Sequence, residues 1–252
     1  MDAATELRVA LSRGPELELQ SCTPELPPVW RNLLRWNFQG ATGLGRTLFT
    51  CVGGHLALPD RGAALVGRED GGNLLVLPPR EVWERGELTP TELTQWSFLV
   101  ASAGQAMLLT LPQLHLGCIN YFDAGNWALN FAAEPHGMKN APEHRRVHMH
   151  LLGRSRAAGD PSWQWGEAPK FPDYADREAW ASKHELLSAA ECKKIVAEAE
   201  RVLRERYGFT SQQISPWETC SACEYPMVVT PEQSGGRCAE CGDQQFGVCY
   251  LE

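Results

Sequence analysis

The chain has 252 residues, of which 43% are hydrophobic and 21% are charged, values that are ordinary for a globular protein. Its formal net charge is −8, and this excess of acid argues against a general binder of nucleic acid or anionic membranes. No apolar run approaches the roughly 20 residues that a membrane span requires, and the acidic start differs from a signal peptide. We therefore expect a cytoplasmic protein without a membrane span.

Residues 1–46 are irregular and broken by prolines, and we expect them to be an extension packed on the core. From 47 onward the chain changes to short hydrophobic runs separated by Gly- and Asp-rich joins, which are typical of strands and turns. The predicted strands are TLFTCV (47–52), AALVG (63–67) and NLLVLPP (73–79).

A long helix is predicted to begin at Pro90. Thr89 and Glu92 form a capping-box pattern with proline at the first helical position. Apolar residues then recur at helical spacing, which predicts one buried face. These residues are Leu93, Trp96, Val100, Ala103 and Met107.

Two further strands are predicted after this helix, HLGCINYF (115–122) and WALNFAA (127–133), joined by a hairpin turn at DAGN. A polar loop, 134–144, then leads to a predicted strand at 145–155. Because strands follow one another with helices inserted, the order favours an α+β fold with an antiparallel β-sheet and helices packed on it.

The segment 157–174 is rich in Pro, Trp and Gly, and we expect it to lack regular structure. A second long helix follows, with a possible cap at Ser188 and with Gly208 placed to end it. Its expected buried stripe consists of Ile195, Val196, Ala199, Val202 and Leu203.

Residues 210–252 are predicted to form a small four-cysteine zinc-ribbon module. Two CxxC pairs lie fourteen residues apart, and two such turns can complete a tetrahedral four-thiolate shell. A closed shell leaves no open coordination position, so we expect structural Zn²⁺. The expected ligands are Cys220, Cys223, Cys238 and Cys241. The other five of the nine cysteines are scattered and odd in number, which suits free thiols better than disulfides.

His148 and His150 lie two residues apart in a predicted strand, so their side chains are expected to share one face. They could be metal ligands completed by His136 or His144, satisfied polar groups of a half-buried strand, or groups acting on phosphorus. Between 136 and 156 there are five basic residues and one acidic residue. This basic island favours the third role, because cations would bind a phosphate that one imidazole attacks.

The run Arg146-Val-His148-Met-His150-Leu-Leu-Gly-Arg154 resembles the signature of the histidine-triad superfamily, in which three histidines alternate with hydrophobic residues before a turn. GGNLLVLPPREVWERGELTPTEL is similar to the family's strand and the approach to its long helix, and WALNFAA to the strand before the triad. The resemblance covers about a hundred residues. It implies a histidine-triad-like domain over 47–209, including the C-terminal helix.

The resemblance also implies a chemistry, in which the middle histidine attacks the α-phosphorus of a nucleotide conjugate. Aligned on the trailing Leu-Gly pattern, His148 is this nucleophile and His150 orients the phosphate. The expected substrate- and phosphate-binding residues are Arg146, Asn130, Lys139 and Arg154. The leading hypothesis is a nucleotide hydrolase that resembles the diadenosine polyphosphate hydrolases and forms a homodimer.

The sequence departs from the family pattern at Arg146, which stands in place of the first histidine and cannot relay a proton. A second register makes His150 the nucleophile, with Leu152 where the nucleotidyltransferase branch has glutamine. Residues 141–144 read Ala-Pro-Glu-His where the family has a phosphate-cradling Gly-Gln-Ser/Thr-like run. A nucleotidyltransferase and a non-hydrolytic nucleotide-binding or scaffold protein therefore remain alternatives. The acidic ribbon weighs against a DNA-end-processing enzyme.

Overall fold

A computed structural model describes residues 45–123 and 126–229. The expected N-terminal extension lies almost entirely outside this part of the chain. Two of the four expected zinc ligands, Cys238 and Cys241, also lie outside the described residues. Within the described residues, no helix is long and apolar enough to cross a membrane.

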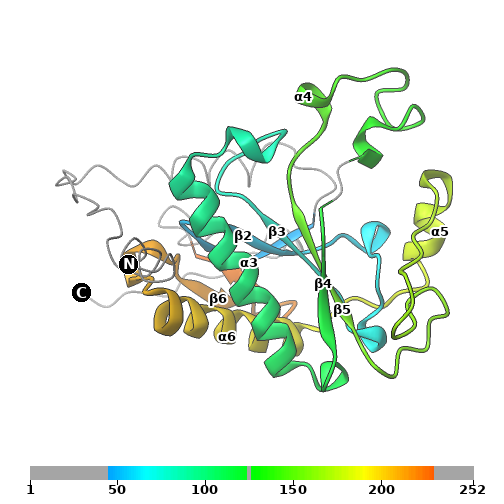
Figure 1. The fold of residues 1–252 in the computed structure, drawn as a ribbon. Coiled ribbons are helices and arrows are strands. Elements are labelled where there is room, and N and C mark those ends of the chain that lie inside the picture. The colour runs from blue at the N-terminus through cyan, green and yellow to red at the C-terminus, as the bar shows by residue number, and fades with distance from the viewer. Residues whose placement is uncertain (1–44, 124–125, 230–252) are drawn as a thin grey trace, which may run out of the picture.

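A five-stranded antiparallel sheet forms the centre of the molecule, with strand order β1-β2-β3-β5-β4 (Figure 1). The expected α+β class with an antiparallel sheet and packed helices is therefore confirmed. The strands of the sheet are β1 (Arg46–Cys51), β2 (Gly54–Leu58), β3 (Asn73–Leu77), β4 (Cys118–Phe122) and β5 (Met149–Arg154). A separate two-stranded sheet consists of β6 (Trp217–Thr219) and β7 (Pro226–Val228).

Two long helices pack on the sheet, and both begin with the local signals expected from the sequence. Thr89 and Glu92 form a capping box at the start of the first helix, and Ser188 and Glu191 form one at the start of the second. Gly208 ends the second helix in the left-handed conformation, with φ of 71°. The α-helices are α3 (Pro90–Thr110), α4 (Ala141–His144), α5 (Arg177–Ala181) and α6 (Ala189–Tyr207).

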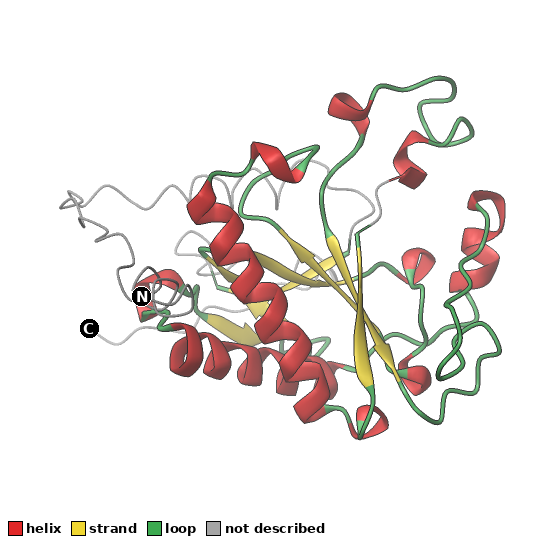
Figure 2. Ribbon diagram, viewed as in Figure 1, coloured by secondary structure: helices red, strands yellow, loops and turns green. Residues whose placement is uncertain are grey.

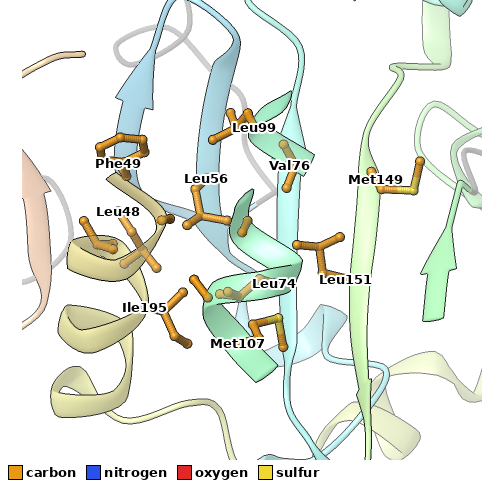
Figure 3. Close-up of a cluster of buried hydrophobic side chains, with 14 of the residues drawn as sticks. Leu48, Phe49, Leu56, Leu74, Val76, Leu99, Met107, Met149, Leu151 and Ile195 are labelled. Carbon is orange, nitrogen blue, oxygen red and sulfur yellow. The ribbon is translucent and has the colours of Figure 1, made fainter. Parts of the chain in front are cut away.

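The main core lies between the sheet and helices α3 and α6 (Figure 3). Alternate strand residues face it, so Leu74, Val76, Met149 and Leu151 point toward the helices. The expected stripe of α6 is fully buried. On α3 the stripe is shifted: Leu93 is 38% exposed, and the residues buried with Trp96, Ala103 and Met107 are Leu99, Ser102, Gly104 and Ala106.

Two predicted strands are wrong, and a third strand was missed. Residues 63–67 are the end of a 3₁₀ helix followed by an irregular stretch, in which Asn73 Oδ1 accepts a hydrogen bond from Leu65 N (3.1 Å) in place of a strand partner. The missed strand is β2, which pairs with β1 through a short turn. Residues 127–133 contain the end of a 3₁₀ helix (Asn126–Leu129) followed by turns, because Asn130 Oδ1 accepts from Ala132 N (2.9 Å).

Long connections lie beyond β4 and β5, where they carry the short helices α4 and α5 (Figure 2). As expected, 157–174 contains no regular element apart from the start of a 3₁₀ helix. Short 3₁₀ helices punctuate the loops. They are Arg61–Ala63, Arg68–Asp70, Arg85–Glu87, Pro112–Leu114, Asn126–Leu129, Tyr174–Asp176 and Ser211–Gln213.

The beginning of the cysteine module packs against the sheet. Val52 N donates to Gln213 O (2.8 Å) and Ser215 N donates to Thr50 O (3.0 Å), so this segment lies along β1. Ile214 belongs to the main core, and Trp217 and Tyr225 pack against it. The described part of the module is therefore continuous with the core of the larger domain.

Candidate active site

His148 and His150 meet at the start of β5, as expected from their spacing. Their Nε2 atoms lie 3.1 Å apart. Met149, between them, points into the core beneath α3, so the two imidazoles lie on the other face of the sheet. His150 is paired with Leu75 on β3 and with Phe122 on β4, which fixes its place in the sheet. The prediction that the two side chains share one face is confirmed.

The hydrogen bonds assign a proton to each imidazole. His148 Nδ1 lies 2.9 Å from the carbonyl oxygen of Arg146, and a carbonyl only accepts, so Nδ1 carries the hydrogen. The Nε2 of a neutral His148 then holds a lone pair, and His150 Nε2–H donates to it. His150 Nδ1 is left buried without a hydrogen-bond partner among the described residues.

Burial keeps both imidazoles neutral. Burial, together with the smaller effect of the neighbouring His148, lowers the pKa of His150 to about 3. Burial also lowers the pKa of His148, although the hydrogen bond to Arg146 and the charge of Asp123 oppose this effect. At pH 7 the pair therefore offers an unprotonated Nε2 on His148 beside an N–H donor on His150, which is the protonation state that a nucleophile needs.

A charged cluster that was not predicted from the sequence lies next to this pair. Asp123 follows directly after Phe122, the residue that pairs with His150, and its carboxylate accepts from Arg85 Nε (2.8 Å). Arg145 Nη2 lies 3.9 Å from the same carboxylate, and its Nη1 binds Glu84 Oε2 (2.8 Å). The charges of Asp123 and Arg145 both act on the pKa of His148, in opposite directions. The position of Asp123 at a strand end was the only signal in the sequence.

The Arg146 guanidinium is held by other groups. Its Nε lies 3.3 Å from Glu81 Oε2, and its Nη1 donates to the carbonyls of Arg145 (2.7 Å) and Pro142 (3.3 Å). Its main-chain carbonyl, rather than its side chain, contacts His148. Arg146 thus orients the His148 imidazole through its backbone carbonyl.

Asn130 and Lys139, two of the expected phosphate contacts, stabilise their own loop. Lys139 Nζ donates to the carbonyls of Asn130 (2.6 Å) and Gly137 (3.3 Å). Among the described residues, neither side chain is hydrogen-bonded to the histidines. Asn130 lacks the expected place because 127–133 does not form the strand that would have carried it.

Arg154 lies at the opposite end of β5 from the histidines. It is buried, donates to the carbonyls of Gln164 and Glu167, and its guanidinium lies over the Trp163 ring at 4.9 Å. These contacts anchor the segment after β5. The basic residues that lie close together in the sequence are therefore separated in the structure. Their side chains leave β5 and the preceding loop in different directions and bind different groups.

Two of the four expected metal ligands, Cys220 and Cys223, lie within the described residues. Cys220 and Cys223 lie in a turn in which Glu224 N donates to Cys220 O and Cys220 N donates to Tyr225 O, both at 2.9 Å. Arg46 Nη1 donates to Cys223 Sγ at 3.5 Å, a contact that suits a thiolate. No group of three potential ligands occurs within the described residues, which contain only two of the four expected sulfurs. The zinc site stays a prediction.

Comparisons with known proteins add no assignment. No protein-family model matches the chain, and no curated protein matches it. Support for a function therefore comes from the histidine pair, its surroundings and the sequence resemblance.

Proposed function

We propose that the protein cleaves nucleotide phosphoanhydrides or related nucleotide conjugates, such as dinucleoside polyphosphates, through a covalent intermediate on His148. The observation that carries this proposal is the arrangement of the imidazole pair. His148 is neutral, its Nδ1–H is held by the Arg146 carbonyl at 2.9 Å, and its Nε2 lies 3.1 Å from a donor on His150. A fixed tautomer with its lone pair on Nε2 is the form that attacks phosphorus.

Two displacements at phosphorus complete the proposed reaction. The Nε2 lone pair of His148 attacks the α-phosphorus, a P–N bond forms, and the bond to the leaving oxygen breaks with its electron pair. Water then attacks the same phosphorus and loses a proton to solvent, and the P–N electrons return to Nε2. The products are the leaving group and a nucleoside monophosphate. While the His148 lone pair is bonded to phosphorus it no longer accepts from His150, so His150 Nε2–H is then placed to donate to a non-bridging oxygen.

The charges around the pair bear on how phosphate would bind. Arg146 is one-third exposed, and its 3.3 Å contact with Glu81 is long for a charge-assisted hydrogen bond. A substrate phosphate would therefore compete with Glu81 for this guanidinium. Arg145, which is more buried and paired with Glu84 and Asp123, provides a second positive charge beside His148.

Incubation with a panel of nucleotide conjugates tests the proposal directly. The protein is sampled rapidly and is not exposed to acid before mass spectrometry. We expect the spectrum to show one added mononucleotide, located on His148. His148→Ala should form no adduct and turn over no conjugate. His136→Ala is the matched control, because this imidazole is 67% exposed and pairs with Glu134 in the loop. Cleavage of dinucleoside polyphosphates by His148→Ala at the wild-type rate would refute the proposal.

A second candidate is a nucleotide-binding or scaffold protein that no longer catalyses. The pairing of Arg146 with Glu81, and of Arg145 with Glu84 and Asp123, favours it, because these acids compensate the cations near the histidines. Saturable nucleoside monophosphate binding without adduct or turnover of any conjugate would support this candidate. A nucleotidyltransferase would form the same adduct and pass the nucleotide to an acceptor other than water.

We also infer a structural zinc ion and a homodimer. The donor set of the zinc site would be the two CxxC pairs, and the Cys220–Cys223 turn with Arg46 beside the sulfur fits a thiolate shell. For the dimer, β4 is the last strand of the sheet, and apolar side chains are exposed on it and near it on α3 and the following loop. These are Leu93, Leu108, Leu109, Leu116 and Tyr121.

A further inference from the structure

Two pairs of aromatic side chains lie on the side of the sheet that carries His150. The Phe122 ring lies 6.2 Å from the His150 ring and is stacked on Phe171 at 4.6 Å. Trp127 lies edge-on to Tyr174 at 6.4 Å. We call these four residues, Phe122, Trp127, Phe171 and Tyr174, the aromatic wall. Two come from the end of β4 and the loop after it, and two from the segment before α5, so the wall joins parts of the chain that are distant in sequence.

The segment that carries half of this wall is firmly anchored. Trp163 Nε1 donates to Gly153 O at 2.7 Å, and the buried Arg154 donates to two carbonyls of the segment. Trp180 Nε1 donates to Leu65 O at 3.2 Å. Figure 1 shows this segment beyond β4 and β5, away from α3. The wall is therefore held in place on the same face of the sheet as His150.

The four rings of the aromatic wall are only partly buried. A small buried cluster of Leu65, Val66, Leu152 and Trp163 covers this end of the sheet. Phe122, Trp127 and Phe171 pack against that cluster but stay partly exposed, and Tyr174 is partly exposed outside it. Partly exposed aromatic rings beside a reactive pair offer π-faces to a planar ligand.

The acidic residues around the aromatic wall favour an uncharged ligand over an anionic one. Asp173, Asp176 and Glu178 are exposed around Tyr174, and the nearest cation, Arg177, lies over the Tyr174 ring at 4.0 Å and binds Glu178 at 3.0 Å. These acids would repel a phosphate chain. An uncharged planar ring can stack on the aromatic side chains and is not repelled by these carboxylates.

We propose that the aromatic wall binds the nucleobase of the leaving group by stacking, so that dinucleoside polyphosphates are preferred over nucleotide conjugates with small leaving groups. This inference rests on the proposed function, since it assigns a subsite to the substrate that His148 attacks. The attacked nucleotide lies over the imidazoles, and the wall beside His150 takes up the far end of a dinucleotide.

Two substrates that transfer the same nucleotide test the inference. We would measure kcat/KM for diadenosine tetraphosphate and for adenosine 5′-phosphoramidate, which both deliver AMP to His148. In Trp127→Ala and in Tyr174→Ala the ratio of the two kcat/KM values should fall roughly tenfold, because stacking of one base is lost. Trp127→Phe, which keeps an aromatic face, should retain most of the ratio.

An unchanged ratio in both alanine variants would overturn the inference, and thermal unfolding shows whether either variant has lost its fold. Tyr174 is partly exposed at the rim, so Tyr174→Ala serves if Trp127→Ala unfolds. Wild-type protein that turns over neither substrate would instead contradict the proposed function. The wall is then tested by equilibrium dialysis: equal affinity for AMP and diadenosine tetraphosphate would refute it, and a dinucleotide preference lost in Tyr174→Ala would support it.

Discussion

At the scale of single residues, burial determines the charge of two imidazoles of the sheet. His150 has a pKa of about 3 because it is desolvated beside His148. His55, on the same sheet face two strands away, is fully buried, contacts Thr50 Oγ1 at 3.0 Å, and has a pKa of about 4 for the same reason. Both residues are therefore neutral in the folded protein at pH 7.

The buried histidines should make stability depend on pH. Their folded pKa values lie below the unfolded value of about 6.5, so the unfolded chain binds protons that the native state excludes. Their contribution is fully present above about pH 6.5 and is lost as the pH falls toward 4. We expect the free energy of unfolding in urea to decrease by about 1.4 kcal/mol per pH unit for each such histidine.

In His55→Gln, the free energy of unfolding should depend less steeply on pH between pH 6.5 and 5 than in the wild type. The difference should equal the contribution of one histidine, because one site that takes up a proton on unfolding is removed. His136→Ala is the control, since its imidazole is largely exposed. Identical slopes in His55→Gln and the wild type would show that His55 does not titrate as its burial implies.

At the scale of elements, each strand of the sheet presents two different faces. On β5, Met149 and Leu151 pack against α3, while His150 and Leu152 face the aromatic wall and its cluster. Its neighbour β4 is the edge strand, and Tyr121 on it is 50% exposed and lies against Gly104 of α3. Among the described residues, strand β4 is therefore an edge strand with an exposed apolar surface, and such an edge would favour pairing with a second copy.

A charge placed on this edge tests the proposed homodimer. We expect light scattering after size exclusion to give twice the chain mass for the wild type and the single-chain mass for Tyr121→Lys. Glu178→Lys on α5 makes a charge change of the same sign on a remote exposed side chain, and should remain dimeric. A wild-type monomer, or a Tyr121→Lys dimer of unchanged stability to dilution, would contradict the proposed interface.

At the scale of the whole molecule, the cysteine module and the sheet share one core. Ile214 and Phe209 are buried in that core, Trp217 Nε1 donates to Glu200 Oε2 at 2.8 Å on α6, and Tyr225 OH donates to Leu187 O at 3.1 Å. A metal that orders the module would therefore stabilise the larger domain as well.

Metal removal should show this coupling. We expect about one zinc ion per chain by elemental analysis, and none in Cys220→Ser/Cys223→Ser. In that variant the melting temperature should fall by roughly 5 °C or more, as expected for a loss of a few kcal/mol. Cys118→Ser, which changes a partly buried thiol on β4, should keep the zinc. Full zinc content in the double variant would exclude these two ligands.

The sequence by itself determined the features that depend on neighbouring residues. Both capping boxes, the left-handed Gly208 and the common face of His148 and His150 follow from contacts within a few positions. The α+β class followed from the order of such elements. The absence of strands at 63–67 and 127–133 escaped prediction because the Asn73 and Asn130 side chains accept hydrogen bonds from backbone N–H groups there, which the hydrophobic pattern does not reveal.

Only the tertiary structure decided the composition of the site. The partners of its charged groups are distant in sequence: Arg85 pairs with Asp123, 38 positions away, and Arg146 with Glu81, 65 positions away. The sequence shows that cations are concentrated near the histidines, but each guanidinium is directed by the carboxylates and carbonyls that folding brings within reach. Which charges face His148, and which rings stand beside His150, are therefore properties of the packed molecule.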